Sequence, residues 1–233
     1  ITVEAHSGAM GGSQSQEFMV ATEAGEDYVV LCRQTGYAAN LEKAVSRPKP
    51  PEAPDPEGGL EPEPVHTPNQ KTIEEVARFL GLPQTSLMKT LCLIADSRPV
   101  VAVLRGDHQL SETKFQSAAG CQEFRPAHPD EIRELFGASA GSLGPVGLQG
   151  VRILIDEALR GRQNMVCGAN RDDYHLKNVT PDEDFRGEWH DLRQVAPGDT
   201  ELNTGAPLEI LKCVEIGHIF KLGYKYSHAM GLT

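Results

Sequence analysis

Four positions in the sequence combine a reactive or hydrogen-bonding group with a distinctive neighbourhood. Lys89 stands in LMKTL, His175 stands in DDYHLKN, and Asp156 directly follows the apolar run RILI. The fourth position is the loop GSLGPV, residues 141–146. A lysine ammonium can hold a phosphate or stabilise developing negative charge, and a histidine can orient a polar ligand. Glycine lets backbone amides approach a ligand, and Pro145 would hold the loop in one shape.

Each of these positions also has an ordinary structural explanation. Lys89 could be a solvated lysine at a helix end, and His175 could be a hydrogen-bonded structural histidine. Asp156 is placed to cap a helix over EALRG, and GSLGPV could be a plain turn between a helix and a strand. A single sequence leaves these alternatives open.

The segment RGDH ends a predicted strand and holds Arg105, Asp107 and His108. We favour a turn with structural ion pairs for this segment, and positioning of a substrate is the second interpretation. Lys114 is expected only to lie on a helix surface.

No motif of covalent or metal-dependent catalysis occurs in the sequence. The nucleophile elbow, a Cys–His pair with a known signature and the H-E-x-x-H zinc motif are all absent. The cysteines are odd in number, far apart and never spaced as C-x-x-C, so we expect neither a metal site nor a disulfide framework. This usage favours a reduced, cytoplasmic setting. The cysteines are Cys32, Cys92, Cys121, Cys167 and Cys213.

The composition limits the classes of protein to which the chain can belong. Of its 233 residues, 39% are hydrophobic, so the chain can bury a core. The formal net charge of −11 argues against general nucleic-acid binding, but not against a local pocket for one nucleic-acid end. No apolar run is long enough to cross a membrane, and no signal peptide is expected. The missing initiator Met predicts a fragment or a processed product.

The elements that would position the reactive residues follow a proline-rich segment, residues 47–66. It holds seven of the sixteen prolines and five acidic residues, which predicts an extended, semi-stiff linker. After it, a capping box of Thr72 and Glu75 opens the first of three predicted helices, and Pro129 lies in the first turn of the third. A short helical turn is expected over residues 85–90. The three helices cover residues 72–81, 111–120 and 128–137.

Short apolar runs bounded by turn residues predict the strands. LCLIA and VVAVL, joined by DSRP, are expected to form an antiparallel hairpin. Because strands and helices do not alternate regularly, we expect an α+β fold and not a doubly wound parallel sheet. The other strand-like segments are VRILID, NMVCGAN, YHLKNV and WHDLRQV.

Several of these segments resemble the insertion (editing) domain of bacterial-type prolyl-tRNA synthetases, within the wider YbaK-like aminoacyl-tRNA deacylase family. They are KTIEEVARFLGLPQTSLMKTL, VAVLRGDHQLSETK, GSLGPV and ILIDEAL. The flanks resemble the synthetase catalytic domain just before and after the insertion, in HSGAMGGSQSQEFMV, GYAANLEKA and VEIGHIFKLGYKYSHAMG. The resemblance covers the whole chain apart from the linker and TELNTGAP.

The resemblance implies an α+β editing domain with a mixed, largely antiparallel, barrel-like sheet and surrounding helices. Partial class II synthetase catalytic-domain segments would flank it. The implied parts are residues 1–46 (catalytic domain), 47–66 (linker), 67–200 (editing domain) and 201–233 (catalytic domain).

The activity that the resemblance implies is hydrolysis of Ala-tRNA(Pro) by attack of water on the aminoacyl ester. A prolyl site cannot exclude the smaller alanine, because missing methylenes give only ~1–3 kcal/mol of discrimination. A second site that admits alanine and excludes proline would remove the error. The resemblance assigns catalysis to Lys89, Gly141 and Pro145, and substrate binding to His175, Asp156, Ser142 and Gly144.

The flanks imply a homodimeric parent that ligates proline to tRNA(Pro) with ATP and Mg, whereas editing would need no cofactor. Glu17 and His218 match residues near the parent's proline pocket. Gln16 and Tyr224 depart from the His and Thr that are common in the family. The arginine-bearing class II signatures and the anticodon-binding domain lie outside this sequence, so the chain alone is not expected to activate proline. The expected partners are the tRNA(Pro) acceptor end and its alanyl or prolyl group, with no membrane.

Two alternatives remain open at this point. One is a deacylase of another small aminoacyl-tRNA, such as Cys-tRNA(Pro). The other is a non-catalytic module that binds tRNA ends or partners. The joint presence of Lys89, Gly141, Pro145, Asp156 and His175 argues against the second alternative.

Overall fold

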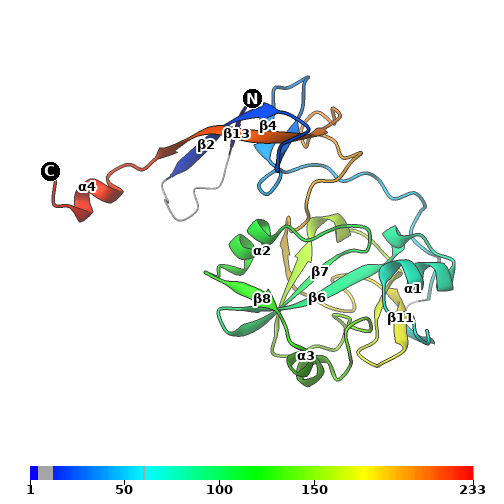
Figure 1. The fold of residues 1–233 in the computed structure, drawn as a ribbon. Coiled ribbons are helices and arrows are strands. Elements are labelled where there is room, and N and C mark those ends of the chain that lie inside the picture. Colours follow the sequence, from blue (N-terminus) through cyan, green and yellow to red (C-terminus); the bar gives the residue numbers. More distant parts are fainter. Residues whose placement is uncertain (5–12, 60, 233) are drawn as a thin grey trace. The chain divides into compact units, whose positions relative to one another are not determined.

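The computed structural model describes residues 1–4, 13–59 and 61–232, which form two compact units (Figure 1). The flank unit combines Ile1–Lys49 with Gln194–Thr233, and the insert unit is Pro50–Arg193. The part HSGAMGG of the first flank motif, residues 6–12, lies outside the described residues. The other residues of the flank motifs fall within the flank unit. None of the described helices has the length and apolar character needed to cross a bilayer.

The insert unit is built on a five-stranded sheet of order β12-β9-β7-β6-β8. The predicted hairpin is confirmed, because β6 and β7 pair antiparallel over eight residues each. The pairs β7–β9 and β9–β12 are parallel, which makes the sheet mixed. The bounds are β6 Met88–Ala95, β7 Arg98–Arg105, β8 Phe124–Pro126, β9 Arg152–Asp156 and β12 Glu188–His190.

A second, antiparallel sheet of the insert unit has the order β10-β11-β5. Its strand β5 lies inside the segment predicted as a linker. Upstream of β5, Asp55 accepts hydrogen bonds from Arg162 Nε at 2.6 Å and from the Gln163 N–H at 2.8 Å. The compact insert unit therefore includes the segment from Pro50 onward. The bounds are β5 Glu63–His66, β10 Met165–Gly168 and β11 Tyr174–Val179.

The three predicted helices are confirmed, each with a left-handed glycine at its end. The capping box of Thr72 and Glu75 is present, with Thr72 Oγ1 accepting from the Glu75 N–H at 3.2 Å. The helical turn predicted over residues 85–90 is wrong beyond Ser86, because Met88 already belongs to β6 and packs into the core. The helices are α1 Ile73–Leu80, α2 Glu112–Ala119 and α3 Pro129–Phe136, with 3-10 turns at Gln84–Ser86 and Glu157–Leu159.

Apolar side chains cover both faces of the five-stranded sheet. Alternate strand residues supply the two clusters: Val101 and Val103 pack on one face, and Ala102 and Leu104 pack on the other. The first cluster extends onto α3 through Phe136, whereas α2 joins the second cluster. The sheet between these clusters is thereby held in a fixed position.

The flank unit contains a closed ring of strands in the order β1-β2-β13-β3-β4. The long strand β13 pairs antiparallel with both β2 and β3. The structure therefore places its closed barrel in the flanks, whereas the editing segment was expected to hold the barrel-like sheet. The bounds are β1 Thr2–Glu4, β2 Gln14–Ala21, β3 Asp27–Leu31, β4 Ala38–Asn40 and β13 Glu209–Lys221, followed by α4 Lys225–Ala229.

Candidate active site

A cavity of about 610 Å³ opens in the insert unit, along one edge of β6. This volume lies within the range of about 300–1,000 Å³ that is typical of small-molecule sites. Every residue from Leu87 to Leu93 contributes to the wall. Because successive strand residues point to opposite faces of a sheet, a cavity lined by consecutive residues must run along the strand edge.

The rest of the wall brings together segments that are far apart in the sequence. It includes residues before and within the first turn of α1, the start of GSLGPV, the end of β10 and one side chain of β11. Three of the residues predicted from the sequence line this cavity: Lys89, Gly141 and His175.

Lys89 lies half-buried on β6, with its ammonium held by a neighbouring carbonyl. Its Nζ donates to the His108 carbonyl oxygen at 2.8 Å. Burial lowers the pKa of Lys89, while Glu74 and Asp107 act in the opposite direction. Asp107 is itself gripped by Arg105, through Nε at 2.6 Å and Nη2 at 2.9 Å. The ion-paired turn favoured for RGDH is therefore present, and its next residue anchors the lysine.

His175 is only 6% exposed, and its ring is fixed in place. Its Nδ1 lies 2.7 Å from Thr67 Oγ1. Burial lowers the pKa of His175, and a backbone hydrogen bond with Gly141 acts in the opposite direction. The imidazole is therefore neutral at pH 7, so it can orient a polar ligand but does not supply a positive charge.

Sequence reasoning missed Thr67, the partner of His175. Thr67 directly follows β5, and the pairing of His66 with Tyr174 brings the two segments together. No local spacing in the sequence connects residues 67 and 175, because their proximity depends on strand register.

The glycines of GSLGPV permit a close approach, but the approaching group is the chain itself. Gly141 has φ +102°, and an added Cβ would lie 2.9 Å from Lys71 Cβ. A Cβ on Gly144 would lie 1.8 Å from the Gly168 carbonyl oxygen, which leaves no room for any side chain. The Gly144 N–H already donates to Asn170 Oδ1 at 2.8 Å. The loop is thus packed backbone to backbone against the end of β10.

Three predicted residues of this loop do not reach the cavity wall. Ser142, Gly144 and Pro145 are buried behind Gly141 in the packed part of the loop. Sequence reasoning also missed Asn170. Its Nδ2 donates to the Val146 carbonyl oxygen at 3.0 Å, so Asn170 holds the loop at both Gly144 and Val146. These residues support the wall without forming it.

The structure corrects the expectation for Asp156, because its carboxylate is fully buried and does not line the cavity. One oxygen accepts from the Ala158 N–H at 3.0 Å, which is the capping interaction considered as an alternative. The other oxygen accepts from the Leu192 and Arg193 N–H groups at 2.8 and 3.1 Å. A carboxylate engaged in this way joins two segments and is not available to a substrate ammonium.

Two other groups in the wall bear on the type of chemistry. Burial raises the pKa of the Cys92 thiol, so it is a poor nucleophile at neutral pH. The Thr90 hydroxyl is buried and has no hydrogen-bond partner among the described residues. The Cys92 thiol of this wall is therefore not activated for nucleophilic attack.

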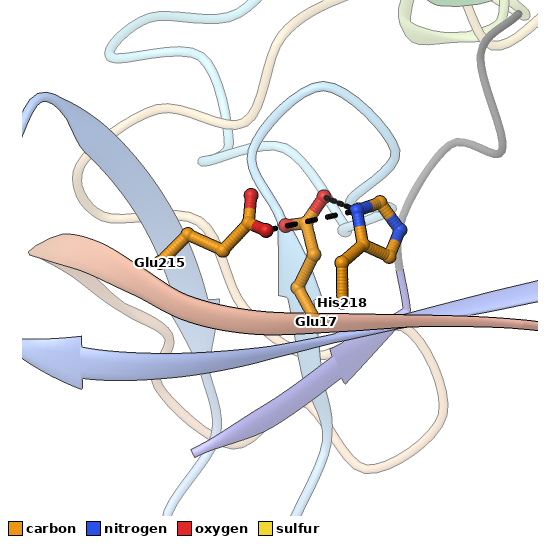
Figure 2. Close-up of side chains that lie close together, drawn as sticks. All are labelled: Glu17, Glu215 and His218. Carbon is orange, nitrogen blue, oxygen red and sulfur yellow. Dashed lines mark ion pairs between the residues drawn. The ribbon is translucent and has the colours of Figure 1, made fainter.

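The flank unit brings its own two predicted residues together, on β2 and β13 (Figure 2). His218 is directly opposite Glu17 in register, and its Nδ1 lies 3.8 Å from Glu17 Oε1. Glu215 Oε1 lies at the same distance from Nδ1, and Ser15 Oγ contacts Nε2. The ligand atoms of the two glutamates and the histidine lie within 4.8 Å of one another, a set that could hold a divalent cation or an ammonium group.

Glu215 was also missed by sequence reasoning, for a clear physical reason. Residues three apart on a regular strand point to opposite faces. A register shift between Glu215 and Gly217 changes this parity and brings Glu215 to the same side as His218.

Comparisons with known proteins show the family to which the chain belongs. Residues 67–185 match the family model of the aminoacyl-tRNA editing domain, and the chain belongs to this family. A relative from Geobacter sulfurreducens, named proline–tRNA ligase, is 46% identical over 99% of this chain and 40% of its own length. A proline–tRNA ligase of Anaeromyxobacter sp. (strain K) is 47% identical over 100% of this chain and 41% of its own length. The chain thus spans about 40% of the length of these relatives.

A solved structure of a proposed trans-editing enzyme for prolyl tRNA synthetase shares the fold. It is 21% identical, with a TM-score of 0.50, and the match covers 57% of this chain and 87% of that one. The α+β class expected from the sequence and the resemblance to prolyl-tRNA synthetases with an editing domain are therefore both confirmed.

Proposed function

We propose that this chain is an editing deacylase that hydrolyses the aminoacyl ester of Ala-tRNA(Pro) with water as the nucleophile. One observation carries the proposal. Lys89, Gly141 and His175 come from three distant segments and line one cavity in a domain of the aminoacyl-tRNA editing family.

The side chains in this cavity suit the binding and cleavage of an ester. The Lys89 ammonium can hold the terminal phosphate or stabilise negative charge that develops on the ester. The neutral His175 can hydrogen-bond the ribose of the terminal adenosine. The raised pKa of Cys92 supports water as the attacking group.

Selection of alanine over proline requires a local constriction, because the cavity as a whole is much larger than either side chain. A volume of about 610 Å³ must also receive the terminal adenosine. The packed GSLGPV loop offers a rigid wall that begins at Gly141. A rigid wall can exclude a larger ring, which a flexible wall would accommodate.

For the whole protein, we propose ATP- and Mg-dependent ligation of proline to tRNA(Pro) in the cytoplasm by a homodimer. The relatives named proline–tRNA ligase, which match nearly the whole chain, support this proposal. Glu17 would then pair with the secondary ammonium of proline, and His218 would line the pocket for its ring. The partner of both activities is the acceptor end of tRNA(Pro).

The proposal is tested by offering the 233-residue chain Ala-, Pro- and Cys-tRNA(Pro) in separate reactions. The remaining ester is measured by acid gel electrophoresis over time. Faster loss of the alanyl ester than of the other two supports the proposal. Faster loss of the cysteinyl ester identifies the alternative deacylase, and binding without ester loss identifies a binding module. Either of these results contradicts Ala-tRNA(Pro) editing.

A further inference from the structure

One edge of β6 is unpaired where the strand passes the cavity. The strand β7 pairs with all of Met88–Ala95, but β8 covers the opposite edge only at Leu93–Ala95. Further back, an isolated parallel bridge joins Leu87 to Val166. Within the described part of the chain, no strand covers the edge between these two contacts, and this stretch lines the cavity.

The direction of the backbone groups on this edge follows from two hydrogen bonds. The Leu87 carbonyl accepts from the Gly106 N–H at 2.7 Å, on the β7 side. The Cys92 carbonyl accepts from the Ala127 N–H at 3.0 Å, on the β8 side. In an antiparallel ladder, alternate residues turn their N–H and C=O groups to opposite edges. Thr90 has the same parity as Cys92, so its N–H and C=O both face the open edge.

An unpaired strand edge inside a cavity is a template for an extended ligand. Exposed edges bind peptides by strand addition, in which main-chain groups form the hydrogen bonds. An aminoacyl ester has an ammonium donor and a carbonyl acceptor on either side of one α-carbon. It therefore matches a single strand residue.

We propose that the aminoacyl group of the substrate adds to β6 at Thr90 as a one-residue antiparallel strand. The α-ammonium donates to the Thr90 carbonyl, and the ester carbonyl accepts from the Thr90 N–H. This inference rests on the proposed editing function and specifies how the amino acid is held.

Only the antiparallel direction satisfies both groups of the ligand. An antiparallel pair exchanges both hydrogen bonds between the same two residues, whereas a parallel partner spreads them over two residues. The ester end then points toward Leu87 and the end of β10, where Gly168 and His175 line the cavity. The methyl group of alanine shares a sheet face with the Thr90 side chain, because directly opposed residues lie on the same face.

In this arrangement the Thr90 N–H acts on the reacting carbonyl. When the oxygen of water bonds to the carbonyl carbon, the π-electron pair moves to the carbonyl oxygen, and the Thr90 N–H stabilises the resulting charge. The electron pair returns as the bond from carbon to the ribose oxygen breaks. The ribose oxygen takes the proton that water lost, which leaves free alanine and the tRNA hydroxyl.

A binding experiment tests the contact without requiring turnover. The probe is 3′-deoxy-3′-(L-alanylamino)adenosine, whose amide resists hydrolysis, added to the ¹⁵N-labelled 233-residue chain up to saturation. We expect the Thr90 amide proton to shift strongly downfield, and the amide of Ile94, whose edge is covered by β8, to shift little. An unmoved Thr90 amide at the highest probe concentration overturns the inference.

A backbone substitution tests the kinetic role. Replacing Thr90 by its α-hydroxy analogue removes the N–H donor and keeps the side chain. We expect hydrolysis of Ala-tRNA(Pro) to slow by about 10²–10³-fold, as for loss of one oxyanion donor, with little change in melting temperature. The matched control is the α-hydroxy analogue of Ile94, which removes a sheet hydrogen bond. It should lower the melting temperature and leave the rate within about threefold.

The outcomes separate this inference from the function on which it rests. If the unmodified chain hydrolyses none of the charged tRNAs, the proposed function fails and the inference fails with it. If the unmodified chain is active and the Thr90 analogue keeps its rate, the function stands and only this inference is overturned.

Discussion

The two polar clusters of this molecule differ in the backbone hydrogen bonds that are left open beside them. In the flank unit, Glu17 lies on β2 and is paired with Val3 of β1 on one side and with His218 of β13 on the other. In the insert unit, β6 has an open edge at Thr90, beside Lys89. The backbone at Glu17 is therefore paired on both edges, whereas the backbone at Thr90 has one edge open to the cavity.

One member of the flank cluster, Glu215, is more exposed to water than the histidine of the cavity, whereas Glu17 is buried. His175 is 6% exposed, whereas the side chain of Glu215 is 42% exposed. Charges act more strongly where water is excluded, because the effective dielectric constant is lower. A change in the buried part of the cavity should therefore have a larger effect than a change at Glu215.

The largest effect is expected from Lys89→Ala. Lys89 is the only lysine of β6 in the described cavity wall. Because its loss removes charge stabilisation, hydrolysis of Ala-tRNA(Pro) should slow by about 10²–10³-fold. Initial rates and thermal melting are measured together. Lys212→Ala, an exposed lysine of the flank unit, is the control. If the Lys89→Ala chain folds and keeps the original rate, the charge of Lys89 does not contribute to hydrolysis.

Asp156→Ala should act on stability instead of chemistry. Three backbone N–H groups lose a buried charged acceptor, so the free energy of unfolding should fall by about 3 kcal/mol. Urea unfolding measures the loss, and Glu183→Ala at an exposed position is the control. The hydrolysis rate per folded molecule should stay the same. A large rate loss without destabilisation would show that Asp156 acts on the substrate.

Gly141→Ala should cost more than Gly147→Ala, although both glycines have positive φ. An alanine Cβ at Gly141 meets Lys71, whereas nothing lies within 4 Å of one at Gly147. We expect a loss of about 1–3 kcal/mol at Gly141, and a smaller loss from backbone strain alone at Gly147. Urea unfolding of the two variants measures the difference, and equal losses would contradict the packed geometry of the loop.

The smallest effect is expected from the pH dependence of stability due to His175. Its pKa is lowered in the folded state from an ordinary value of 6.5, so the unfolded chain binds more protons as the pH falls below about 6.5. The free energy of unfolding should therefore decrease with falling pH in this window. His175→Gln should flatten this part of the profile, as measured by urea unfolding between pH 7.5 and about 5. An unchanged slope would show that the histidine is not buried in its neutral form.

The local elements of the insert unit were predictable because their signals lie within a few residues. The capping box of Thr72 and Glu75 and the glycines at 81, 120 and 137 fixed three helix ends through local hydrogen bonds and positive φ angles. Lys89 and His175 were also found from the sequence, by a resemblance that local motifs carry. Their placement in one cavity is visible only in the structure.

The remaining features depend on what lies beside each segment. The open edge at Thr90 exists because β8 is short, which no property of residue 90 reveals. Glu215 joins His218 through a register shift, and Thr67 meets His175 through the pairing of β5 with β11. The sequence allowed Asp156 either to bind the substrate or to cap a helical turn. The hydrogen bonds from the Leu192 and Arg193 N–H groups favour the structural role. Long-range pairing therefore set the limit of the sequence analysis.

The chain order of the two units has a consequence for folding during synthesis. The insert unit is one unbroken segment, residues 50–193, so all of its strands are synthesised before the last part of the flank unit. The flank ring depends on β13, which pairs with both β2 and β3 and is completed only at Lys221. The edges of β2 and β3 that pair with β13 therefore stay uncovered while the whole insert is translated. This interval is when a nascent chain most needs protection from pairing with its neighbours.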